Sequence, residues 1–231
     1  MGSTIDIVYR DQHLVVVNKA PGVPSQPDPS GDASALELAS AACEAALHPI
    51  HRIDRPASGL LLFATGSRAA AELSSMLQHG MIERRYWAIV SGEVDPPEDR
   101  VEQWTVFDRR ANRSRVVRSR EPRPNAKRAA LSYRCLRSGD RYTLLEVRLD
   151  TGRHHQIRAQ LASRGWPIRG DLKYGARRSQ PEGGIALHAV YLSFAHPEDG
   201  RTVELGATAP DSRLWQALTE GLTPNRGTGC S

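Results

Sequence analysis

Short apolar stretches separated by polar turns recur along most of the chain, a pattern typical of β-strands. The segments that show it are 5–9, 14–18, 60–64, 84–91, 129–136, 142–149, 185–194 and 202–205. Helices are predicted over four other segments, at about 35–47, 68–79, 155–163 and 212–220. Strands and helices do not alternate regularly, so a doubly wound parallel sheet is not expected. We predict an α+β fold with a mixed, largely antiparallel β-sheet flanked by helices.

Polar residues at the predicted helix starts are candidate N-terminal caps. Asp32 or Ser34 precedes the first helix, Ser67 the second and Asp211 the last. Gly80 follows the second helix and is its expected stop, because glycine tolerates the left-handed conformation that often ends a helix.

The composition is that of an ordinary globular protein: 231 residues, 39% hydrophobic and 25% charged. We expect one domain over 1–222, with a basic arm over about 101–128, and a flexible C-terminal tail over 223–231. No apolar run approaches the roughly 18 residues of a membrane-spanning helix, and no basic region of a secretory signal opens the chain. Three widely spaced cysteines without a C-x-x-C pair favour a reducing, cytoplasmic compartment.

The charge balance is modest, at +5, but the 31 basic residues include just three lysines. A preference for arginine fits phosphate recognition and equally fits a GC-rich genome. Nine of the basic residues, opposed by three acidic ones, lie in the basic arm, with Arg113 and Arg115 near its middle. Such a run is either a solvated stretch of like charges or an arm that contacts nucleic-acid phosphates.

A first group of candidate catalytic residues occupies 51–59, with the sequence HRIDRPASG. Asp54 lies between Arg52 and Arg55 and close to His51, and the neighbouring positive charges favour its ionised form. An ionised carboxylate in a cleft serves as a nucleophile or a general base. The alternative is an ordinary surface turn held by salt bridges.

A second group occupies 151–158, with the sequence TGRHHQIR. If His155 starts a helix, Arg158 lies one turn further on the same face. Arg153 precedes them, so anion-binding and hydrogen-bonding groups gather near a helix start, as a phosphate or nucleic-acid site requires. The alternative is a solvated basic helix start.

Other chemistry has little support in the sequence. His48, His51 and Asp54 are spaced by three, but Pro49 and Pro56 make one continuous helix across them unfavourable, so no metal site is expected. A G-x-S-x-G elbow, a P-loop and a G-x-G-x-x-G motif are absent from the sequence, so hydrolase chemistry and a nucleotide cofactor have little support.

The two groups together resemble the RNA pseudouridine synthases of the RluA type, whose signature reads roughly H-R-L-D-R-x-T-S-G. Further matches follow in the family's order: LVVVNKAPG at 14–22, RRYWAIV at 84–90, PIRGDLKYG at 167–175 and LHA at 187–189. The resemblance implies the pseudouridine synthase fold and the isomerisation of uridine to pseudouridine in RNA. It implies no metal and no organic cofactor.

Residue roles follow from the matched positions. Asp54 would be the catalytic aspartate, Tyr86 would lie against the target base, and Arg158 would pair with Asp54 and orient it. Arg52 would enter the RNA stack in place of the flipped uridine. The remaining expected RNA contacts share these motifs or the basic arm: His51, Arg55, Arg153, His155, Leu187, Arg113 and Arg115. Ala57 replaces the family's usual threonine, and His154 a commoner threonine.

The substrate class remains open between ribosomal and transfer RNA. The family match begins near the first residue, so we expect no S4 RNA-binding domain, and RNA recognition would then fall to the catalytic domain and its basic arm. We expect a monomer. Two other functions are kept as alternatives: a non-catalytic RNA-binding or RNA-folding factor on the same scaffold, and a nuclease that uses histidine and aspartate.

Overall fold

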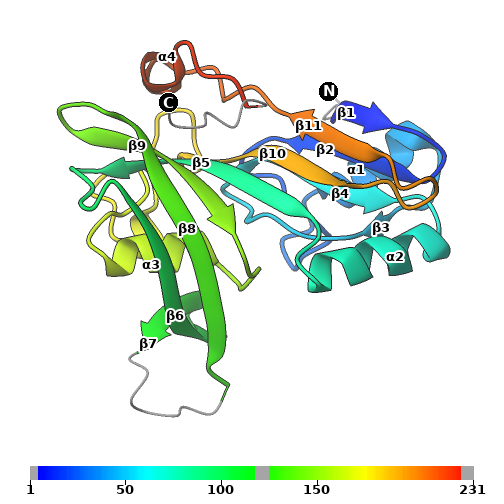
Figure 1. Cartoon of the computed structure of the whole chain (residues 1–231), viewed down its shortest axis with the longest axis horizontal. Helices are drawn as coiled ribbons and strands as arrows, with labels where there is room; N and C mark the ends of the chain where they lie inside the picture. The colour runs from blue at the N-terminus through cyan, green and yellow to red at the C-terminus, as the bar shows by residue number, and fades with distance from the viewer. Residues whose placement is uncertain (1–4, 118–124, 225–231) are drawn as a thin grey trace. The chain divides into compact units, whose positions relative to one another are not determined.

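The computed structural model describes residues 5–117 and 125–224, which form two compact units (Figure 1). The first unit comprises the described residues up to Arg84 and those from His188 onward, and the second comprises those from Arg85 to Leu187. That the two units act as the single domain expected over 1–222 stays a prediction. Most of the predicted C-terminal tail lies outside the described residues.

The first unit is built on a mixed sheet. Its strands are β1 (Asp6–Arg10), β2 (Leu14–Lys19), β3 (His48–Pro49), β4 (Ser58–Ala64), β10 (Leu187–Ala195) and β11 (Thr202–Gly206). β2 pairs antiparallel with β1 and β4, β10 pairs antiparallel with β11, and β4 runs parallel to β10. Every residue of β4 is buried, as its continuous apolar sequence predicts.

Helices cover both faces of this sheet, which explains the burial of β4. Successive strand side chains point to opposite faces. Leu61 and Phe63 therefore pack with α1 (Ala35–Cys43), whereas Leu60 and Leu62 pack with Leu73 of α2 (Ser67–Gln78). The last helix, α4 (Arg213–Thr219), buries Trp215 and Leu218.

The helix boundaries confirm one predicted cap and correct two. Ser34 caps α1 in a capping box: its hydroxyl accepts from the Glu37 amide, and the Glu37 carboxylate accepts from the Ser34 amide at 2.9 Å. This helix ends at Cys43 and not near 47, because Glu44 adopts a left-handed conformation. Gly66 stands at the cap position of α2, so Ser67 is its first helical residue. Ser212, and not Asp211, precedes α4.

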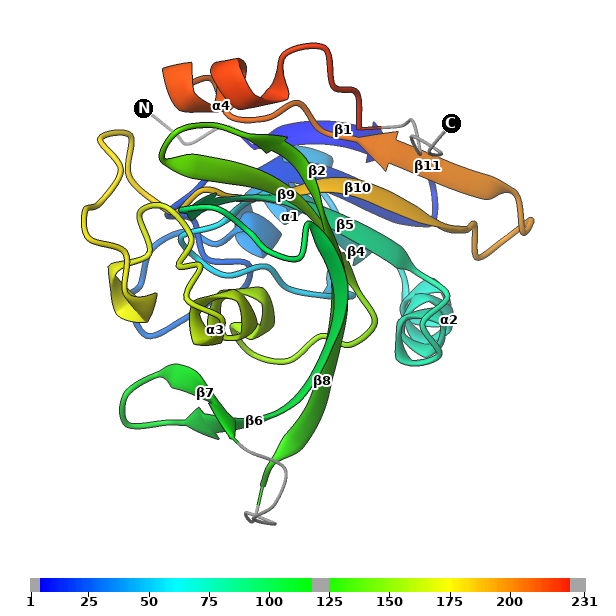
Figure 2. The ribbon, with the colours of Figure 1, turned by 60° about the vertical axis from the view of Figure 1, so that its left-hand side comes forward.

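The second unit is an antiparallel sheet with one helix packed on it. Its strands, in order across the sheet, are β5 (Glu83–Ser91), β9 (Tyr142–Leu149), β8 (Lys127–Ser138), β6 (Glu98–Asp108) and β7 (Arg113–Val117). α3 (Gln156–Ser163) and the short 3-10 helix η1 (Leu172–Tyr174) complete it. Both ribbon views show β6 and β8 as long neighbouring strands with β7 beside the far end of β6 (Figures 1 and 2).

The described part of the basic arm lies in strands β6, β7 and β8, except for the turn residues 109–112 and 125–126. β6 pairs with β7 from Trp104 to Asp108, so the segment 98–117 is a β-hairpin. The residues that follow, 118–124, lie outside the described ranges. Antiparallel pairs in both units and the parallel β4–β10 pair confirm the predicted mixed, largely antiparallel α+β fold. Across the two described ranges, no helix has the length and apolar character needed to cross a membrane.

Candidate active site

Residues 51–57 of the motif lie in the loop that joins β3 to β4 in the first unit, and Ser58 and Gly59 begin β4. Asp54 lies in a tight turn, in which the amide of Ala57 donates to the carbonyl oxygen of Asp54 at 2.9 Å. The Asp54 side chain is half-buried, while Arg52 and Arg55 on either side are exposed. The loop thus presents one carboxylate between two exposed guanidinium groups, as the sequence predicts.

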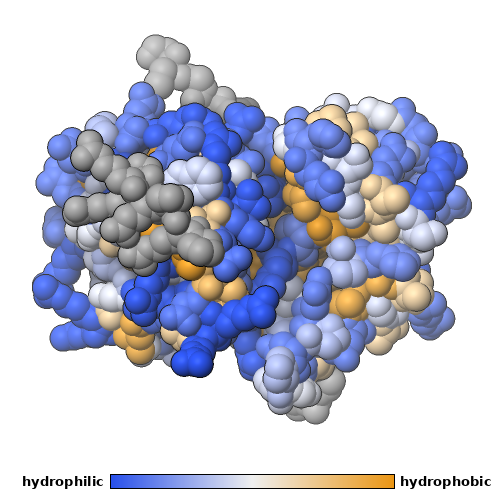
Figure 3. Space-filling model, turned by 90° about the horizontal axis from the view of Figure 1, so that it is seen from below, coloured by the Kyte–Doolittle hydropathy of each residue, from blue (hydrophilic) through white to orange (hydrophobic). Residues whose placement is uncertain are grey.

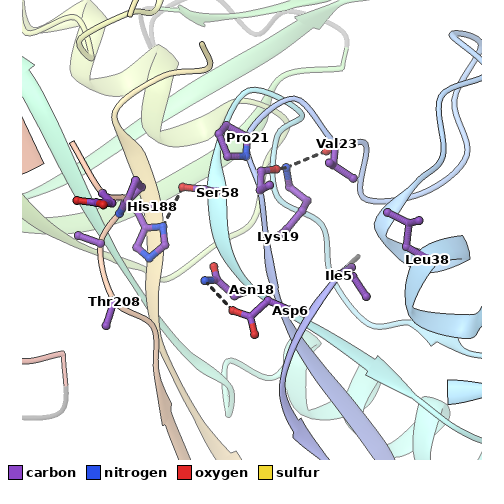
Figure 4. A pocket seen from close by; sticks show the side chains of 14 residues that line it. Ile5, Asp6, Asn18, Lys19, Pro21, Val23, Leu38, Ser58, His188 and Thr208 are labelled. Carbon is purple, nitrogen blue, oxygen red and sulfur yellow. Dashed lines mark hydrogen bonds between the residues drawn. The ribbon is translucent and has the colours of Figure 1, made fainter. Parts of the chain in front are cut away.

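A buried lysine holds this loop from beneath. Lys19, at the end of β2, is 1% exposed. Its Nζ donates to the carbonyl oxygens of Ala57 at 2.7 Å and Arg55 at 3.2 Å within the loop. It also donates to the carbonyl oxygens of Val23 at 2.8 Å and Ala20 at 2.9 Å (Figure 4). Removing either turn would leave a buried amino group with fewer partners, so Lys19 locks the 20–23 turn and the Asp54 loop together.

The environment of Lys19 pulls its protonation in two directions. Burial lowers the pKa of Lys19 to about 7, and the negative charge of Asp54 acts against that lowering. Four carbonyl acceptors also favour the ammonium form, because it has three N–H donors. The charge of Asp54 therefore stabilises the group that fixes the position of its own loop.

Arg55 braces the same loop from the outside. Its Nε donates to the carbonyl oxygen of Gly22 at 2.9 Å, and its guanidinium forms ion pairs with Asp32 and, at 3.6 Å, with Asp28. The amide of Gly22 returns a hydrogen bond to the Arg55 carbonyl at 2.8 Å. Arg55 is expected to bind RNA, and this side chain is already engaged within its own unit.

His51 and Ser25 anchor the first half of the loop. The Nε2 of His51 accepts from the amide of Leu62 at 3.2 Å, so the ring is neutral. Burial, and then the charge of Arg84, lower the pKa of His51 to about 3. Ser25 donates to the carbonyl oxygen of Ile53 at 2.7 Å and accepts from its amide at 3.2 Å. These contacts support a structural part for His51 more than a direct contact with RNA.

The end of the motif is fixed by a close approach of two strands. Gly59 has φ +110°, and a Cβ there would lie 2.3 Å from the carbonyl oxygen of Ala189 on β10. Glycine is therefore the residue that this parallel pairing admits. Next to it, the Ser58 hydroxyl lies 2.8 Å from Nδ1 of His188, whose pKa burial lowers to about 4.

A cavity of about 580 Å³ lies within the first unit (Figure 4). Its polar lining includes Asp6, Asn18, Lys19, Ser58 and His188. These groups bond to one another or to the backbone: Asn18 to Asp6 at 3.3 Å, Ser58 to His188, and Lys19 to its carbonyls. The cavity therefore belongs to the framework that supports the Asp54 loop.

In the second unit, Arg158, which is expected to pair with Asp54, forms an ion pair with Asp171. Arg158 on α3 is 4% exposed and Asp171 is 1% exposed. Nε of Arg158 donates to Oδ2 of Asp171 at 2.7 Å and a terminal nitrogen donates to Oδ1 at 2.8 Å. A bidentate pair of this kind fixes the plane of the guanidinium. Sequence reasoning missed Asp171, which lies in the matched PIRGDLKYG motif.

The start of α3 departs in detail from the prediction. His155 is not the first helical residue but the residue before it, in a left-handed conformation with φ 50°. It lies one turn before Arg158, and its Nδ1 is 3.0 Å from the Tyr174 hydroxyl. The Arg158 guanidinium lies over the Tyr174 ring at 4.9 Å. Both predicted residues therefore converge on Tyr174.

The remaining predicted residues of this unit occupy two kinds of position. Tyr86 on β5 and Leu187 at the start of β10 are buried, at 5% and 4% exposure. Arg153 is exposed, and its Nε donates to the Arg128 carbonyl oxygen at 2.8 Å. Arg115 on β7 is exposed and lies 3.9 Å from Asp108.

The structure thus brings the predicted residues together in two sets. One loop of the first unit carries His51, Arg52, Asp54 and Arg55, and the second unit gathers Arg153, His155 and Arg158 at the start of α3. Tyr86 belongs to the second unit as well. Within the described residues, no group of three histidine, cysteine or acidic side chains is placed to hold a metal ion.

Comparison with solved structures identifies the class of fold. The human protein titled RNA Pseudouridylate Synthase Domain Containing 1 superimposes with a TM-score of 0.75 at 24% identity, covering 97% of this chain and 99% of that one. A likeness at this identity establishes the fold alone, and it agrees with the fold that the motifs imply.

Comparison of sequences goes further. A family model described as RNA pseudouridylate synthase matches residues 13–163. The uncharacterised RNA pseudouridine synthase YlyB of Bacillus subtilis is 33% identical over 96% of this chain and 74% of its own length. The ribosomal large subunit pseudouridine synthase D of Zymomonas mobilis is 33% identical over 89% and 69%. The tRNA pseudouridine synthase C of Haemophilus ducreyi is 30% identical over 93% and 94%. This chain belongs to the RNA pseudouridylate synthase family.

Proposed function

We propose that the protein converts specific uridines of ribosomal or transfer RNA to pseudouridine and that Asp54 is its catalytic aspartate. The observation that carries this proposal is the construction of the Asp54 loop. A half-buried carboxylate stands on a turn that Lys19 holds by its backbone carbonyls, in the family's signature motif. A catalytic group needs such a fixed position, because small displacements of reacting groups cost large factors in rate.

The reaction is an isomerisation and balances without a co-reactant. The N1–C1′ bond breaks, the uracil turns, and a C5–C1′ bond forms. The proton that leaves C5 is matched by one that N1 takes up, so no electron is gained or lost. The Asp54 carboxylate has two possible targets in this sequence, C1′ of the ribose or the base itself.

The other roles in the proposal rest on the matched motifs. Tyr86 provides a ring face for the uracil and a hydroxyl near it. Arg158 orients Asp54, and its own guanidinium plane is set by Asp171. Taking a uridine out of an RNA stack costs a few kcal/mol, and the exposed Arg52 side chain can offset part of that cost by stacking in the vacated space.

Two relatives at similar identity carry different substrates in their names, one ribosomal RNA and the other transfer RNA. We therefore keep both RNA classes in the proposal. We also propose that the protein is cytoplasmic and works as a monomer. Size-exclusion chromatography of the purified chain at several concentrations tests the oligomeric state.

The experiment is tritium release from bulk RNA labelled at uracil C5, separated into ribosomal and transfer fractions. Wild type and Asp54→Asn are assayed in parallel. Release by wild type alone supports the proposal and assigns the RNA class. Equal release by the variant removes Asp54 from its role. RNA binding with no release from either fraction overturns the catalytic function and favours the non-catalytic RNA-binding factor.

A further inference from the structure

A column of rings in the second unit leads from the buried interior to an exposed phenylalanine. Tyr174 and His155 meet edge to face, with ring centres 5.7 Å apart. His155 stacks on His154 at 3.8 Å, and His154 meets Phe107 at 4.0 Å. Tyr174 and His155 are buried, whereas Phe107, the outer member of the column, is 42% exposed.

Hydrogen bonds hold the hairpin that carries Phe107 in place. The backbone amide of Ser114, which faces Phe107 across the β6–β7 pair, donates to the Tyr174 hydroxyl at 2.8 Å. The Ser114 hydroxyl donates to the carbonyl oxygen of His154 at 2.5 Å. Lys173 donates to the carbonyl oxygen of Asn112 at 3.1 Å. These bonds tie the hairpin to the residues that supply the other rings of the column, so the position of the Phe107 ring is built into the fold.

Arginines lie at both ends of the ring column. Arg109 and Arg110 follow Phe107 after the single acidic residue Asp108, in the exposed turn of the hairpin. The Arg113 guanidinium lies over the Tyr174 ring at 4.9 Å. Figure 3 views the molecule from the end at which β7 lies in Figure 1, and hydrophobic residues form small areas there among hydrophilic ones. A ring held beside cationic side chains is the combination with which proteins bind single-stranded nucleic acid.

We propose that the exposed face of Phe107 is a stacking platform for an unpaired base of the RNA substrate. His154 backs the ring, and the arginines of the turn contact the neighbouring phosphates. This inference rests on the proposed function, because it names how the same RNA is gripped next to the second unit's predicted site residues. A paired base is already stacked on its neighbours, so the platform selects RNA with a loop or bulge.

The same strand offers a matched control. Trp104 has nearly the same exposure as Phe107, 43% against 42%. It lies three residues earlier and so on the opposite face of β6. Its cross-strand neighbour Arg128 is held by Glu102 in two hydrogen bonds of 2.6 and 2.7 Å. Trp104 therefore lacks backing rings like those of Phe107, and its neighbouring arginine is paired with a carboxylate.

The test measures binding of two fluorescent RNA probes in the Asp54→Asn background, which prevents turnover. One probe is a stem-loop with an unpaired uridine-rich loop, and the other is the blunt duplex of its stem. Phe107→Ala should weaken binding of the stem-loop by about fivefold or more and leave the duplex unchanged. Phe107→Trp should bind the stem-loop as tightly as the protein with Phe107. Trp104→Ala should leave the affinities for both probes unchanged.

Salt separates stacking from charge in this experiment. The factor lost in Phe107→Ala should be the same at low and high salt, whereas the factor lost on neutralising an arginine shrinks as salt rises. Equal losses for both probes, or an equal loss in Trp104→Ala, would overturn the platform. Tritium release by the wild-type protein, which keeps Asp54, tests the proposed function separately. Release together with unchanged stem-loop binding in Phe107→Ala overturns the platform alone.

Discussion

Two buried neutral histidines make the stability of this protein sensitive to mild acid. His51 accepts a hydrogen bond from the Leu62 amide, and His188 lies 2.8 Å from the Ser58 hydroxyl. Burial lowers the folded-state pKa of His51 to about 3 and of His188 to about 4. Both titrate near 6.5 in the unfolded chain. Between pH 6.5 and about 4, the unfolded chain thus binds protons that the folded chain does not.

The size of the effect follows from linkage. Stability from these two groups is complete above pH 6.5 and is lost as the pH falls below it. pH 5 lies about 1.5 units below the unfolded pKa of each histidine, so each ring lowers the free energy of unfolding there by about 2 kcal/mol. Together they should lower the free energy of unfolding by about 4 kcal/mol between pH 7 and pH 5, a large part of a typical domain stability of about 5–15 kcal/mol.

The assay is urea unfolding followed by tryptophan fluorescence at pH 7 and pH 5. His188→Gln should be less stable at pH 7 but should lose about 2 kcal/mol less than wild type on going to pH 5. His79 is exposed at the end of α2, so His79→Gln is the matched control and should keep the wild-type pH dependence. Equal pH dependence in wild type and His188→Gln would refute the assignment of the acid sensitivity to the buried ring.

The remaining predictions concern Gly59, the β6–β7 hairpin and the effect of removing metal ions. Gly59→Ala places a methyl group against the Ala189 backbone, and the alanine must adopt φ +110°, which is strained for a residue with a side chain. We expect the free energy of unfolding, measured with urea, to fall by at least about 3 kcal/mol, or the protein not to fold. Arg115→Gln should weaken RNA binding and reduce the slope of log Kd against log salt by about one if the residue contacts a phosphate; an unchanged slope means a solvated side chain. EDTA should leave tritium release unchanged, and a loss that a divalent ion restores, but RNA refolding does not, would contradict this.

The sequence predicted the elements with the most regular apolar patterns and missed contacts that depend on tertiary packing. The unbroken run in β4 could be predicted because burial on both faces demands it. Lys19 was missed because a lysine at the end of a strand resembles any surface lysine until the 20–23 turn and the 55–57 backbone close over it. Asp171 was missed for a similar reason, since nothing local indicates that it pairs with Arg158.

The candidate site shows the same division. The spacing placed Arg158 one turn after His155 at a helix start, and this agrees with the structure, although the helix begins at Gln156. The charge pattern of the basic arm could not distinguish a solvated run of like charges from an arm that binds nucleic acid. The β6–β7 pairing shows that the segment 98–117 is a β-hairpin. The ring column was beyond reach, because Phe107 and His154 are distant in sequence and meet through the fold.

The order in which the chain is synthesised gives the two units different folding schedules. All of the second unit lies between the two segments of the first, so β4 must wait for His188 and Ala189 before its parallel partner exists. The second unit is a continuous stretch of the chain, from Arg85 to Leu187, so it is complete earlier. During translation, the Ser58–Gly59 end of β4 therefore remains without its parallel partner while the second unit is made. An unpaired strand segment of this kind can pair with other chains. The yield of folded protein in heterologous expression should rise with slower synthesis or with chaperones that cover the unpaired end of β4.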